Sequence, residues 1–99
     1  MSEFNKNKLE KILNYRGMYG FEFDLSKAVS FVAGFDAANE GLVMKGFREW
    51  FLNKFLDSCP EPFSWIVLVE RELDEMGKDE KQKVDRFVEM VIDFLHDSQ

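Results

Sequence analysis

The sequence of 99 residues has little of the chemistry that disulfide-bonded domains and small metal sites need. It contains one cysteine, Cys59, and one histidine, His96. A single cysteine excludes an internal disulfide bond and fits a protein kept in a reducing compartment. A structural zinc site needs several cysteine or histidine ligands, and the chain has one of each. We therefore expect neither a disulfide framework nor a zinc centre, and no cofactor.

Long hydrophobic runs and clusters of basic residues are absent as well. The longest apolar run is the five residues 65–69, and residues 1–11 lack the apolar region of a signal peptide. The net charge is −6, with eight Lys or Arg against seven Asp or Glu in residues 1–56, and five against twelve in residues 57–99. Nucleic acids and anionic membranes attract clustered basic residues. We expect a cytoplasmic protein that binds neither of them directly.

Aromatic residues, by contrast, are abundant. Eleven Phe and two Trp occur in a chain that is 45 % hydrophobic. Each of these side chains buries a large apolar area, so a compact core is possible even in so short a chain. We expect residues 1–99 to form a single domain.

Apolar residues recur at helical spacing in five segments, which glycines and two prolines separate. We expect an all-α fold, a compact single-domain bundle of about five helices. Apolar side chains cover most of the second segment, which predicts a central helix, and residues 21–23 alternate like a short extended piece. The predicted helices are residues 3–15, 25–39, 44–57, 64–76 and 79–96.

The fourth of these helices is ambiguous, because its β-branched residues 65–69 also fit a buried strand. Strong helix formers follow them, and Ser64 is a good N-cap, so we favour a helix. Asp79 and Gln82 have the spacing of a capping box that opens the fifth helix.

The fifth helix carries an acidic row, which we define as Asp85, Glu89, Asp93 and Asp97. Residues four apart lie on one side of a helix, and the apolar residues of this helix fall on the opposite side. Like charges at this spacing repel each other by a few tenths of a kcal/mol per pair. The pattern fits both a plain solvated face and a surface that meets a basic protein.

An enzyme is a weaker alternative. His96 lies in the last turn of the last helix, where a capping or surface role is expected, and no Gly-rich phosphate loop is present. Carboxylates of the fourth and fifth helices could imitate the Mg²⁺ cage of all-α nucleotide pyrophosphohydrolases, but such a cage needs carboxylates that face each other. The fourth-helix residues concerned are Glu70, Glu72, Asp74 and Glu75.

Three aromatic residues are possible binding residues. Trp50 and Trp65 lie among apolar residues, which predicts a place in the core. Tyr19 lies in a turn between Gly17 and Gly20, and it is the best candidate for an exposed aromatic side chain.

Four short segments resemble a known family. They are residues 16–20, Arg-Gly-Met-Tyr-Gly; residues 25–26, Leu-Ser; residues 31–36, Phe-Val-Ala-Gly-Phe-Asp; and residues 46–50, Gly-Phe-Arg-Glu-Trp. Over about residues 12–70 the chain resembles small bacterial immunity proteins of polymorphic and contact-dependent growth-inhibition toxin systems. Gly17 stands where these proteins usually carry proline, and Phe35 where they usually carry tyrosine.

The resemblance implies a cytoplasmic protein that binds and neutralises the toxic C-terminal domain of its own system without catalysis. Many such toxins are basic nucleases, which an acidic surface would attract. The predicted partner-binding residues are the acidic row, Glu70, Asp74, Glu75 and Tyr19. An acidic helical adaptor that binds another basic protein is the alternative.

Overall fold

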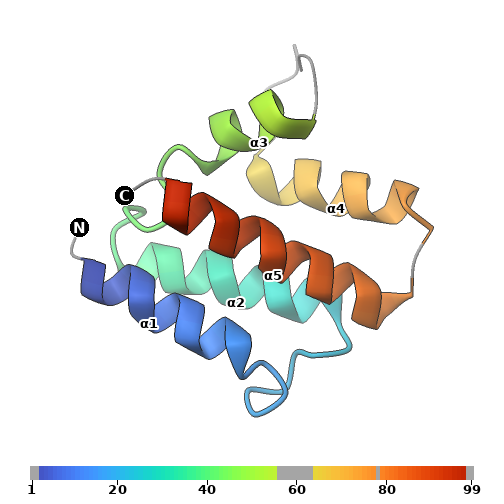
Figure 1. Ribbon diagram of the computed structural model, residues 1–99, viewed down its shortest axis with the longest axis horizontal. Coiled ribbons are helices and arrows are strands. Elements are labelled where there is room, and N and C mark those ends of the chain that lie inside the picture. Colours follow the sequence, from blue (N-terminus) through green and yellow to red (C-terminus); the bar gives the residue numbers. More distant parts are fainter. Residues whose placement is uncertain (1–2, 56–63, 78, 98–99) are drawn as a thin grey trace.

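The computed structural model describes residues 3–55, 64–77 and 79–97. These residues form five helices and no strand, so the predicted all-α class is confirmed (Figure 1). The helices are α1 (Glu3–Asn14), α2 (Leu25–Ala38), α3 (Phe47–Phe55), α4 (Trp65–Glu75) and α5 (Glu80–Asp97).

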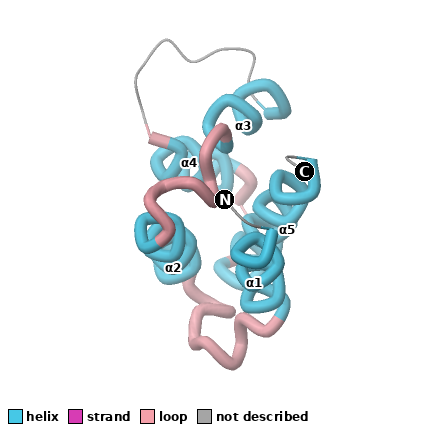
Figure 2. The backbone as a smooth tube through the Cα atoms, turned by 90° about the vertical axis from the view of Figure 1, so that its left-hand side faces the viewer, coloured by secondary structure: helices cyan, strands magenta, loops and turns pink. Residues whose placement is uncertain are grey.

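The central helix is α5, which packs against α1, α2 and α4. Figure 2 shows α1 and α5 on one side, α2 on the other, and α3 and α4 above them. The expectation that residues 25–39 are the central helix was wrong. Ser26, Ser30 and Gly34 of α2 all face solvent, whereas α5 alone has buried residues along almost its whole length.

The ambiguous residues 65–69 belong to α4, as predicted, with Leu68 and Val69 buried. Ser64 occupies the N-cap position, although its side chain makes no capping hydrogen bond. The capping box is present: Asp79 Oδ1 accepts from Gln82 N at 2.8 Å, and Gln82 Oε1 accepts from Asp79 N at 3.2 Å. The amides of Asp79 and Gln82 at the start of α5 are thereby satisfied.

Two local predictions were wrong. The third helix begins at Phe47, not at residue 44, because Asp36 Oδ1 accepts from Met44 N at 2.8 Å and Gly46 has φ +87°, which is not helical. Residues 22 and 23 form a turn, so residues 21–23 are not an extended piece. The predicted end of the third helix at residue 57 lies outside the described residues.

Aromatic rings fill the core where α3, α4 and α5 meet. Phe47 is fully buried, and its ring lies 5.3 Å from that of Trp65 and 5.2 Å from that of Phe94, both edge-on. Trp50 and Trp65 were predicted to lie in the core; they pack against it but are only half-buried. The part of the chain that the structure describes contains no buried polar or charged residue, so the interior of the domain is held together by apolar packing.

Candidate functional site

The acidic row does not run straight along α5. Each step of four residues advances about 40° around a helix, so the row turns through about 120° from its first to its last residue. It therefore crosses the solvent-facing side of α5 obliquely, from the border with α1 to the border with α3. Asp85 is half-buried, whereas Glu89, Asp93 and Asp97 are exposed.

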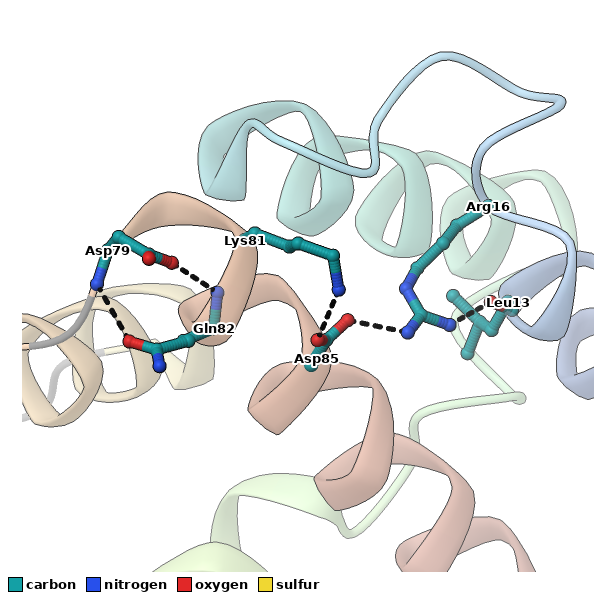
Figure 3. Close-up of polar contacts among 6 residues, drawn as sticks. All are labelled: Leu13, Arg16, Asp79, Lys81, Gln82 and Asp85. Carbon is teal, nitrogen blue, oxygen red and sulfur yellow. Dashed lines mark hydrogen bonds and ion pairs between the residues drawn. The ribbon is translucent and has the colours of Figure 1, made fainter.

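Asp85 is held at the border with α1. Its Oδ1 lies 2.6 Å from Nη2 of Arg16, and its Oδ2 lies 3.0 Å from Nζ of Lys81 (Figure 3). Arg16 also donates through Nη1 to the carbonyl of Leu13 at 2.9 Å. The hydrogen bond from Arg16 and, less strongly, the one from Lys81 hold the pKa of the Asp85 carboxyl below its usual value of about 3.8. Asp85 is thus a structural clamp between α5 and the end of α1.

This lowered pKa predicts an acid-dependent contribution to stability. The stabilisation is complete above the ordinary pKa of about 3.8 and is lost as the pH falls through the lower pKa of the folded state. Asp85→Asn should cost about 0.5–1.5 kcal/mol near neutral pH, a value discounted because both partners are partly exposed. In urea unfolding, the gap between the parent and this variant should shrink between about pH 5 and pH 2. Asp93→Asn is the matched control, and an equal gap for both variants would contradict the clamp.

The last residue of the row is engaged at the border with α3. Asp97 accepts from Nε1 of Trp50 at 2.9 Å and lies 3.7 Å from Nζ of Lys54. Both ends of the row therefore bind groups of this same chain. Sequence spacing could not reveal these partners, because Arg16 lies 69 positions from Asp85 and Trp50 lies 47 from Asp97.

The middle of the row, Glu89 and Asp93, is the part that faces outward. Glu89 makes an exposed pair with Nη1 of Arg86 at 3.1 Å, at the i,i+3 spacing. Asp93 has no ion-pair partner among residues 3–55, 64–77 and 79–97. With Asp85, Arg16 and Asn14 they line a shallow groove between α5 and the end of α1, whose wall also includes the apolar Val88 and Ile92. Glu89 and Asp93 are the part of the acidic row that remains available.

The acidic residues of α4 do not join this surface. Asp74 accepts from Nζ of Lys83 at 2.9 Å, and this bond raises the pKa of the lysine. Lys83 and Asp85 are two positions apart on α5, about 200° around the helix. Asp74 therefore binds α5 on the side opposite to the one that carries Asp85. Glu75 is exposed and Glu70 is half-buried. Among the described residues, no three His, Cys, Asp or Glu side chains gather as metal ligands would.

His96 contacts the Glu10 carboxylate, which joins the end of α5 to α1. It occupies the last turn of α5, as expected. The contact lies on the solvent-facing side of both helices, where the two side chains are exposed and half-buried, respectively. Its role is that of a surface link between the two helices.

Tyr19 is exposed, as predicted. Two further exposed side chains, Tyr15 and Met18, lie near it, and neither was identified from the sequence. Tyr15 and Tyr19 are each 55 % exposed, and Met18 is 83 % exposed. With Ile12, Lys8 and Lys11 they line a second groove beside α1. The sequence feature that could have predicted this groove is the spacing of Tyr15 and Met18, which lie three residues apart where the first helix leads into the glycine turn.

None of the helices in the described ranges is long and apolar enough to cross a membrane. Comparison of the chain with protein-family models, with curated proteins and with solved structures gave no match.

Proposed function

We propose that this protein is an immunity protein, which binds a cognate toxin domain in the cytoplasm and neutralises it by stoichiometric binding. The toxin domain we envisage is a basic nuclease. The residues that would meet it first are Glu89 and Asp93, with the shallow groove that they line. This chain contributes no catalytic step; it covers a surface that the nuclease needs.

The observation that carries the proposal is the outward pair of carboxylates on α5, the helix that packs against α1, α2 and α4. Glu89 and Asp93 are exposed, while Met90 and Val91 between them are fully buried. Such packing fixes the positions of the two charges before a partner arrives, so little ordering is needed on binding. Charges placed in this way accelerate the encounter with a basic surface and suppress binding of acidic ones.

The arrangement at the two ends of the row favours a toxin-binding surface that contains only the two middle carboxylates of the row. Asp85 and Asp97 already have partners within the domain. A toxin residue that competed for either of them would have to break an existing bond. We therefore assign recognition to Glu89 and Asp93, and helix positioning to Asp85.

The direct test uses the reading frame next to this one. The toxin domain encoded there is expressed with and without this protein, and growth is followed. The purified domain is then titrated with the protein by calorimetry. We expect rescue of growth and a stoichiometric complex of about one to one, with a Kd in the nanomolar range or below. Absence of a complex, with both proteins folded, would refute the proposal. A complex with a basic protein that is not toxic would favour the adaptor alternative.

A further inference from the structure

The second groove lies on the other side of α1 from the acidic row. Lys8 and Glu10 are two positions apart and so point in nearly opposite directions around α1. Glu10 reaches His96 of α5, whereas Lys8, Lys11 and Tyr15 line the groove. Binding in this groove and binding at the acidic row are therefore separate properties of the molecule.

The turn that carries the exposed apolar side chains of this groove is held in place. The turn that carries them is closed by hydrogen bonds from Met18 N to Tyr15 O at 2.9 Å and from Tyr19 N to Arg16 O at 3.1 Å. Arg16 is itself clamped to Asp85, and the ring of Tyr19 lies 6.2 Å from that of Phe31 on α2. A partner would thus meet a preorganised surface, which reduces the entropy lost on binding.

The rim of the groove is positively charged on a protein whose net charge is −6. Lys8 and Lys11 are both exposed, and the residues that line the groove include no Asp or Glu. The positions three and four residues from each lysine along α1 also carry no acidic side chain. In the described ranges, neither lysine has an ion-pair partner. Two uncompensated cations therefore border an exposed apolar surface.

We propose that this groove binds a segment of a partner protein in which bulky apolar side chains are flanked by carboxylates. Tyrosine and methionine offer large contact area with adaptable shape, so they suit an inserted leucine or phenylalanine. The two lysines would pair with the flanking carboxylates and fix the direction of the segment. An anionic membrane fits less well, because two lysines cannot offset the repulsion from an acidic protein.

The probe is a peptide of about nine residues in which glutamate alternates with leucine and phenylalanine. One control peptide has lysine in place of glutamate, and another has serine in place of the apolar residues. Binding to the intact protein is measured by fluorescence anisotropy and mapped by amide chemical shifts. We expect shifts confined to residues 7–19 and their neighbours, and at least about tenfold weaker binding of both controls.

Two variants with matched controls test the groove residues. Met18→Ser should weaken binding about tenfold, whereas Leu42→Ser, at another exposed apolar position, should not change it. Lys8→Gln with Lys11→Gln should weaken binding about three- to tenfold at low salt, and Lys27→Gln with Lys45→Gln should not. Thermal melts confirm that each variant is folded, which the exposure of these side chains leads us to expect.

Several results would overturn the proposal. Equal binding of the lysine peptide, or shifts centred on α5, would show that the groove does not select an acidic apolar segment. Shifts at residues 7–19 that depend on protein concentration without peptide would identify a second copy of this chain as the occupant. Binding to phosphatidylserine vesicles without peptide binding would identify a lipid surface instead.

Discussion

Phe47→Ala is expected to lower the free energy of unfolding by about 3–5 kcal/mol, the range for removing a fully buried aromatic ring. Phe47 is completely buried where α3 meets α4 and α5, and its ring contacts those of Trp50, Trp65 and Phe94. The loss is the sum of the transfer free energy of the ring and the free-energy cost of the cavity that remains, because the surrounding side chains can relax only partly into it. Small domains have about 5–15 kcal/mol in total, so much of the stability would be lost.

The measurement is urea unfolding followed by circular dichroism at 222 nm, which avoids the change that the substitution makes to tryptophan fluorescence. Phe23→Ala is the matched control, because it removes the same ring from a position that is 63 % exposed. It should change the free energy of unfolding by less than about 0.5 kcal/mol. Similar losses for the two variants would contradict the described core.

The second large effect concerns the outward part of the acidic row. Glu89→Gln with Asp93→Asn should slow association with a basic toxin domain by about tenfold at low ionic strength, because two steering charges are removed. The dependence of the rate on salt should become weaker as well. Folding should be unchanged or slightly more stable, since repulsion at the i,i+4 spacing is relieved. Stopped-flow mixing at several salt concentrations, with thermal melts, gives all three quantities.

A control must keep the same net charge. Glu40→Gln with Glu49→Gln removes two exposed negative charges outside α5 and should slow association far less. Asp85 is left intact, because its substitution would also release Arg16. If the test and control variants behave alike, recognition does not depend on the acidic row, and Glu70, Asp74 and Glu75 on α4 become the next candidates.

The fold was predictable where local sequence chemistry decides it. Helical spacing of apolar residues, the glycines between the segments and the capping box of Asp79 and Gln82 placed most helix boundaries within one or two residues. The start of α3 was missed because Asp36, eight residues earlier, binds the amide of Met44. A contact of this kind leaves no periodic signal in the sequence.

The candidate site was less predictable, because it depends on contacts between residues that are even further apart in the sequence. Helical spacing identified the acidic row correctly as a row. Which of its members remain available depends on Arg16, Trp50 and Lys54, which only folding brings to α5. The same holds for the aromatic groove: Tyr19 was found from its glycine turn, but the lysines that line the groove with it come from the helix before.

The central position of α5 has a consequence for synthesis. Chains grow from α1 towards α5, so the helix that packs against α1, α2 and α4 is made after all of them. Until α5 emerges from the ribosome, a principal packing surface is missing for Leu9 and Leu13 of α1 and for the buried side of α2. Nascent chains should therefore stay sensitive to proteases until α5 is complete. If a ribosome stalls before α5 has been made, the released product should not fold, and it lacks Glu89 and Asp93. Stability and the proposed recognition surface are therefore gained together, when α5 emerges.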